Sequence, residues 1–170
     1  MTTSDSTNAD NSAADAALTY KDKGNEAFKL GQWQEALKLY TQAIKASDKH
    51  KELPVFYKNR AAAHLKLASY QAALDDCTES LRLTPKDPKA LFRRAQALEA
   101  LEKFEEAYRD ATELFKEDPA NKSVQPMLQR LHLVVQERAA KNAKTITKVR
   151  IGMFALRKAC PISNASVTYL

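Results

Sequence analysis

The stretch LGQWQEALKLYTQA, residues 30–43, recurs twice further along the chain with other letters in the same frame. The matching segments are LASYQAALDDCTES at 67–80 and LEKFEEAYRDATEL at 101–114, which begin 37 and then 34 residues further on. A period of about 34 residues, with aromatic and small residues at fixed offsets, predicts an array of paired helices. The aromatic column holds Trp33, Tyr70 and Phe104, and the small-residue column holds Ala36, Ala73 and Ala107.

The composition and the positions of the prolines favour an all-α fold. The chain has only three glycines in 170 residues and is rich in good helix formers. Pro54 and Pro88 suit first helical positions, where a missing amide hydrogen costs nothing. We expect two antiparallel helices in each repeat, near residues 17–30 and 33–46, 54–67 and 70–83, and 88–101 and 104–117.

A further helix follows the repeats. Its apolar residues are spaced by 4, 3 and 4 positions, which predicts one buried stripe; they are Val124, Leu128, Leu131 and Val135. We expect this helix, near 123–147, to cover the open end of the third repeat. The predicted organisation is a disordered leader at 1–16, a repeat domain at 17–148 and an irregular basic tail at 149–170. The repeats themselves would lie near 17–53, 54–87 and 88–121.

These letters resemble the tetratricopeptide repeat (TPR) family, and the resemblance covers about residues 17–120. It implies three helix pairs stacked as a right-handed superhelix, closed by a C-terminal capping helix. In such an array the first helix of each pair lines a concave inner groove.

Five polar residues fall on these inner helices. Lys21 and Asn25 are four apart, as are Lys89 and Arg93, so each pair shares one helix face. Asn59 lies on the helix between them. Asparagine is a mediocre helix former, so two interior asparagines on groove faces indicate a role beyond helix formation. Two amides and three cations suit a ligand with two clustered carboxylates, such as an acidic C-terminal residue.

The resemblance narrows to the chaperone-binding subgroup of TPR domains, which hold a terminal EEVD peptide of heat-shock protein 90 or 70 in a two-carboxylate clamp. The matching motifs are KDKGN for Lys21 and Asn25, YKNR for Asn59, and KALFR for Lys89 and Arg93. The resemblance implies that the first three hold the terminal carboxylate, that Lys89 holds the side-chain carboxylate, and that Arg93 braces the peptide. Phe28 matches the place where such domains meet the ligand's apolar residue.

Longer stretches, such as KGNEAFKLGQWQEALKLYTQAI at 23–44, resemble the N-terminal domain of animal UCS-family myosin chaperones. The resemblance implies an adaptor, not an enzyme, that acts in myosin folding and muscle assembly. Its further partner would be myosin, gripped through an armadillo-like region that has no counterpart in this sequence. The unusual ending suggests a shortened isoform or a truncated product.

Other functions have weaker support. His64 and Cys77 could be in contact, which suggests a cysteine nucleophile activated by histidine. Both fall in packing columns, however, and no third orienting group is apparent. No cofactor is expected, and the three histidines have no metal-ligand spacing with either cysteine. A TPR scaffold for another ligand and a nucleic-acid binder that uses the basic tail remain alternatives.

The charge distribution and the absence of targeting signals bear on nucleic-acid binding and on cellular location. Residues 1–140 carry 21 basic and 21 acidic side chains, so the net charge of +6 lies in the last 30 residues. Because nucleic-acid binding requires a basic face on the fold, no nucleic-acid partner is expected for the repeats. No secretory signal or apolar run of about 18 residues is present, so we expect a cytoplasmic protein without a membrane partner.

Overall fold

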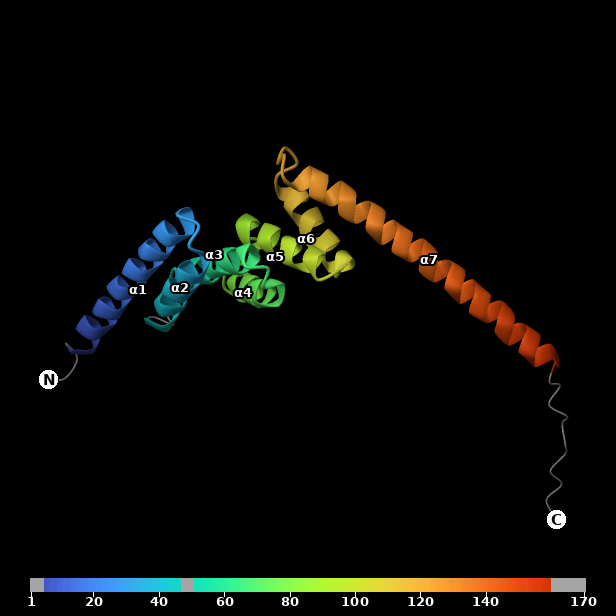
Figure 1. Ribbon diagram of the computed structural model, residues 1–170, viewed down its shortest axis with the longest axis horizontal. Helices are drawn as coiled ribbons and strands as arrows, with labels where there is room; N and C mark the ends of the chain where they lie inside the picture. Colours follow the sequence, from blue (N-terminus) through green and yellow to red (C-terminus); the bar gives the residue numbers. More distant parts are fainter. Residues whose placement is uncertain (1–4, 47–50, 160–170) are drawn as a thin grey trace, which may run out of the picture. The chain divides into compact units, whose positions relative to one another are not determined.

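The computed structural model describes the backbone of residues 5–46 and 51–159, and the side chains of 12–46 and 51–150. The described part is all-α and contains seven helices that follow one another along the chain (Figure 1). The predicted fold class is confirmed. The helices are α1 (Asp5–Lys29), α2 (Trp33–Ala46), α3 (Leu53–Lys66), α4 (Tyr70–Leu83), α5 (Pro88–Ala100), α6 (Phe104–Glu117) and α7 (Val124–Ala159).

Each helix pair is joined by a three-residue turn of the same construction. Gly31, Ala68 and Glu102 occupy equivalent places in these turns and all have a left-handed backbone, with φ of 76°, 55° and 58°. Such a residue just after a helix allows the next amide to close a six-residue bond back to the helix. All three turns make this bond at 2.9 Å: Gln32 to Ala27, Ser69 to His64, and Lys103 to Leu98. The repeat is therefore preserved in the backbone hydrogen bonds.

Successive helices pack against one another through the columns that the sequence indicates. Ala36, Ala73 and Ala107 are fully buried, which lets the paired helices approach closely. α1 and α2 lie close together at Gly24, where an added Cβ would lie 2.7 Å from Cε1 of Tyr40. Neighbouring repeats meet through contacts of α2 with α3, α4 with α5, and α3 with α5.

Two buried ion pairs recur at the repeat spacing of 34 residues. Arg60 of α3 donates to both carboxylate oxygens of Asp76 on α4, at 2.8 and 2.6 Å. Arg94 of α5 makes the equivalent pair with Asp110 on α6, at 2.7 Å for both bonds. The planar guanidinium fits a carboxylate through two parallel bonds, which fixes how the two helices of a repeat lie together.

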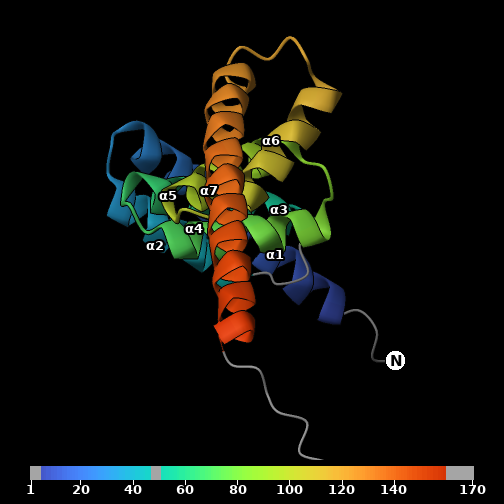
Figure 2. The ribbon, with the colours of Figure 1, turned by 90° about the vertical axis from the view of Figure 1, so that its right-hand side faces the viewer.

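The final helix begins as expected but has two different parts. Val124, Met127 and Leu131 are buried in two clusters with residues of α4, α5 and α6, as a capping helix requires. The chain divides into two compact units, 1–131 and 132–170, and the division falls inside α7. Figure 2 shows α7 as one continuous helix.

Both ends of the chain differ from the sequence expectation. Residues 5–16 of the expected disordered leader are helical, because four alanines at 13, 14, 16 and 17 favour a helix and no proline or glycine precedes Gly24. Residues 149–159 of the expected irregular tail continue α7, because the first proline after Pro126 is Pro161. The rest of the expected tail, 160–170, lies outside the described residues.

Candidate functional site: the inner faces of three helices

Asn25 and Asn59, predicted on separate helices to serve one groove, are in direct contact. The Nδ2 amide of Asn59 on α3 donates to Oδ1 of Asn25 on α1 at 3.1 Å. The Tyr40 hydroxyl on α2 donates to the same oxygen at 2.9 Å. Burial raises the pKa of Tyr40 to about 12 despite nearby Arg93, so the phenol keeps its proton. With its oxygen occupied twice, Asn25 has its own amide hydrogens left to offer a ligand.

Lys21 lies one turn before Asn25 and is half-buried. Its Nζ is 3.0 Å from Oε2 of Glu52, the residue that precedes α3, and 3.5 Å from Oδ1 of Asp22. Burial lowers the pKa of the Lys21 ammonium, but the hydrogen bond to Glu52 and the charges of both acids outweigh this and raise the pKa overall. Lys21 is therefore charged and already engaged with acidic groups of the protein.

Arg93 and Lys89 share one face of α5 but differ in their surroundings. Nη1 of Arg93 donates to the main-chain oxygen of Lys58 on α3 at 2.6 Å. Burial lowers the pKa of Arg93, although the neighbouring Cys77, Asp87 and Tyr40 act against this change. Lys89 is exposed and, in the part of the chain that the structure describes, forms no ion pair. One cation is thus held by a main-chain oxygen and the other is exposed to solvent.

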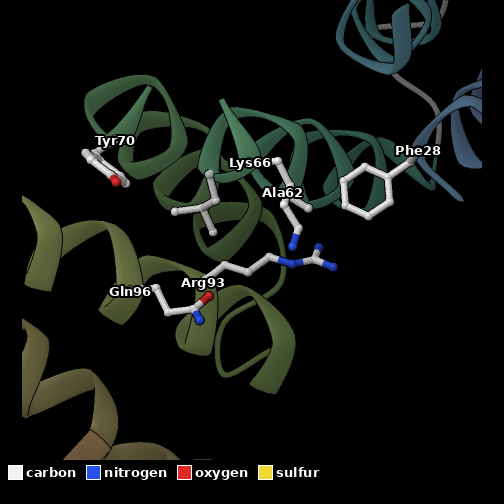
Figure 3. Close-up of a pocket in the computed structure, with 7 residues that line it drawn as sticks. Phe28, Ala62, Lys66, Tyr70, Arg93 and Gln96 are labelled. Atoms are coloured by element: carbon white, nitrogen blue, oxygen red, sulfur yellow. The ribbon is translucent and has the colours of Figure 1, made fainter. Parts of the chain in front are cut away.

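A hollow of about 390 Å³ opens between these helices. Phe28 from α1, Lys66 from α3 and Arg93 from α5 line it, together with Ala62, Leu65, Tyr70 and Gln96 (Figure 3). Phe28 is held by an edge contact with Trp33, with ring centroids 4.7 Å apart. A second hollow of about 420 Å³ lies beside it and is lined by Lys89, Arg93 and Gln96 among others. Arg93 and Gln96 of α5 line both hollows, and the second one is completed by α6 and residues 121–124. Lys21, Asn25 and Asn59 line neither hollow.

Lys66 and Tyr40 also contribute to the groove, although the sequence analysis did not predict them as site residues. Lys66 lies seven positions after Asn59, which is two helical turns and therefore the same face, so spacing could have found it. Its Nζ lies 5.5 Å from the centre of the Trp33 ring, a cation–π contact. The Trp33 ring also contacts Phe28, so the Lys66 ammonium group is held near Phe28. Tyr40 gave no such signal, because it occupies a core column of α2 and reaches the groove only through its hydroxyl.

Cys77 and His64, which the sequence analysis considered as a possible nucleophile and base, are packed core residues. Cys77 is fully buried, and burial raises the pKa of its thiol to about 12, the reverse of what a nucleophilic cysteine needs. Burial also lowers the pKa of His64, although the nearby Asp76 acts against this change. Among the described residues, no three or more His, Cys, Asp and Glu side chains are grouped so as to hold a metal ion.

None of the described helices is long and apolar enough to cross a membrane.

Comparison with known proteins agrees with this architecture. The tetratricopeptide repeat family model matches residues 21–88 and 58–122, so the chain belongs to the tetratricopeptide repeat family. Among individual proteins, the human protein unc-45 homolog B is 36% identical over 134 residues, which are 79% of this chain and 14% of the relative. The human mitochondrial import receptor subunit TOM70 is 42% identical over 105 residues, or 61% of this chain and 17% of that protein.

A solved structure adds information about a ligand. The first TPR of Spaghetti (RPAP3), bound to the HSP90 peptide SRMEEVD, superposes with a TM-score of 0.68 at 32% identity. The match covers 72% of this chain and 95% of that domain. The chain spans about one seventh of unc-45 homolog B and one sixth of TOM70, so what it shares with them is the repeat domain.

Proposed function

We propose that this domain is a chaperone-binding adaptor that holds the C-terminal EEVD peptide of heat-shock protein 90, or of heat-shock protein 70. Lys21, Asn25 and Asn59 would bind the terminal carboxylate, Lys89 the side-chain carboxylate, and Arg93 would brace the peptide. Phe28 would contact an apolar residue of the ligand. The proposed binding unit is residues 17–148, within the predicted cytoplasmic setting.

The observation that carries the proposal is the bond from Asn59 to Asn25. It joins helices of two successive repeats at 3.1 Å, and the Tyr40 hydroxyl completes the two bonds at the Asn25 oxygen. Amide hydrogens oriented in this way, next to charged Lys21, form a site for an anion rather than for a cation. The relative whose structure contains SRMEEVD supports the choice of ligand.

The binding experiment uses a short peptide ending in EEVD with a free carboxylate. We expect a micromolar Kd, about 8 kcal/mol, by isothermal titration calorimetry. Amidation of the terminus should nearly abolish binding, because it removes one of the two carboxylates. Rising salt should weaken binding, because the site is open to solvent. Parallel titration of both chaperone tail peptides measures which chaperone is preferred.

Lys89→Glu tests the role of the exposed Lys89 ammonium group. A reversed charge at this position should lower affinity at least tenfold, about 1.4 kcal/mol, with helix content unchanged by circular dichroism. Lys38→Glu is the matched control, since Lys38 is 72% exposed on α2 and pairs with Glu35 of the same helix. Equal affinity in the two variants, or binding that ignores amidation, would exclude the clamp.

A role in myosin folding is proposed only for a longer protein in which this domain recruits the chaperone. The similarity to unc-45 homolog B supports that setting, and the similarity to TOM70 supports the same module in an import receptor. Recovery of myosin, or of mitochondrial precursor proteins, with the full-length product from cells distinguishes the two.

A further inference from the structure

Two lysine–acid pairs occupy equivalent positions in successive repeats. Lys21 and Lys58 lie 37 residues apart on α1 and α3, the spacing of the first repeat. Each reaches the residue that precedes the first helix of the next repeat, which is Glu52 before α3 and Asp87 before α5. The same position in the fold therefore carries an acid twice.

The two acids are held differently. Asp87 accepts a capping hydrogen bond from the Ala90 amide at 2.9 Å and lies 2.6 Å from Nζ of Lys58. Glu52 makes no side-chain capping bond to α3, and its contact with Lys21 is longer, at 3.0 Å. The Glu52 side chain is also more exposed than that of Asp87, 32% against 19%. The Asp87 pair therefore anchors a helix end by a side-chain cap, whereas the Glu52 side chain does not cap α3.

The difference matters because Lys21 is a proposed ligand-binding cation and Lys58 is not. Glu52 and Asp22 place two negative charges around the single positive charge of Lys21. An incoming carboxylate has to displace Glu52 from the ammonium group or bind beside it against like charge. Either route costs part of the binding free energy.

We propose that Glu52 is a built-in competitor for the ligand carboxylate and sets the affinity of the clamp through Lys21. This inference rests on the proposed function. A partly exposed carboxylate within hydrogen-bonding reach of Lys21, the lysine that would bind the ligand, makes the groove discriminate against weak anions. A single carboxylate gains little from displacing Glu52, whereas a ligand that engages both ends of the groove recovers the loss at Lys89 and Arg93.

Glu52→Gln tests the inference, because glutamine keeps the shape and removes the charge. Calorimetry with the free-carboxylate EEVD peptide should give affinity about threefold tighter than wild type, as expected for a partly exposed ion pair. The matched control is Glu79→Gln, an exposed and ion-paired glutamate on α4 that should leave affinity unchanged. Affinity of Glu52→Gln that is unchanged or weaker overturns the inference.

A double-mutant cycle shows whether Glu52 acts through Lys21. In a Lys21→Met background, Glu52→Gln should no longer tighten binding, because the ammonium group for which Glu52 and the ligand compete is absent. A gain that persists there is a long-range charge effect and overturns the inference. Failure of wild type and all variants to bind the peptide rejects the proposed function itself. Wild-type binding that is lost on amidation but is insensitive to Glu52→Gln rejects only this further step.

Discussion

At the scale of single residues, the groove depends on hydrogen bonds that orient its amides. Asn25 and Asn59 gain nothing as helix formers, yet both lie inside helices. The Tyr40 hydroxyl and the Asn59 amide fill both acceptor positions of the Asn25 oxygen, and Gly24 leaves room for the Tyr40 ring against α1. A side chain of α2, outside the groove-forming helices, thus orients an amide group on α1.

Tyr40→Phe removes this hydroxyl and keeps the ring. We expect a loss of about 1 kcal/mol in unfolding free energy by urea titration, the usual worth of one hydrogen bond. Peptide affinity should fall about threefold, because the Asn25 amide is no longer fixed. Tyr57→Phe is the control, since the Tyr57 ring contacts Arg60 at 5.5 Å and that contact survives the change. Equal peptide affinity in the two variants would contradict the orienting role of Tyr40.

At the scale of elements, the start of α5 connects stability to the site. Asp87 caps this helix and pairs with Lys58, and the main-chain oxygen of Lys58 holds Arg93. Burial by itself raises the Asp87 pKa, but the bonds from Lys58 and the Ala90 amide outweigh it and lower the pKa below the ordinary 3.8. A carboxyl group with a lowered pKa stabilises the fold above its unfolded pKa and loses this effect as pH falls.

Asp87→Ala should therefore destabilise the domain by about 1–2 kcal/mol near neutral pH, through loss of the cap. Asp87→Asn should lose less, because asparagine also caps helices. The difference in stability between wild type and Asp87→Asn should shrink as the pH falls through 3.8. Urea midpoints measured from pH 6 to pH 3 give this dependence, and a difference that stays constant over the range would contradict it.

At the scale of the whole molecule, the repeats need a closed end. Neighbouring repeats bury one another's faces, and the last face is covered by the first turns of α7. Leu131 is fully buried there, whereas Leu133, in the second unit, is 60% exposed. The charge follows a similar division, since the excess of basic residues lies after residue 140, beyond the repeats.

Leu131→Ala should lower the unfolding free energy by about 3 kcal/mol, because it leaves a cavity in the cap. Leu133→Ala makes the same chemical change at an exposed position and should cost less than about 0.5 kcal/mol. Thermal unfolding followed by circular dichroism measures both. Similar losses in the two variants would contradict a cap that ends at Leu131.

Much of the fold could be read from the sequence because it repeats. The columns of Trp33 and Ala36 predict helix pairs, and six helices begin within one residue of the expected positions once the leader is set aside. The helix bounds near the termini could not be read in the same way. There the repeat is absent, and local composition predicted a disordered leader and an irregular tail where residues 5–16 and 149–159 are helical.

The sequence by itself determined the helical repeat and the shared faces of Lys21 with Asn25 and of Lys89 with Arg93, because side-chain direction along a helix depends only on spacing. Only the tertiary structure decided which groups engage those side chains. Glu52 lies 31 residues from Lys21, and Lys58 lies 35 residues from Arg93. Contacts over such separations depend on how helices pack and where a connecting loop ends, and no local period records either.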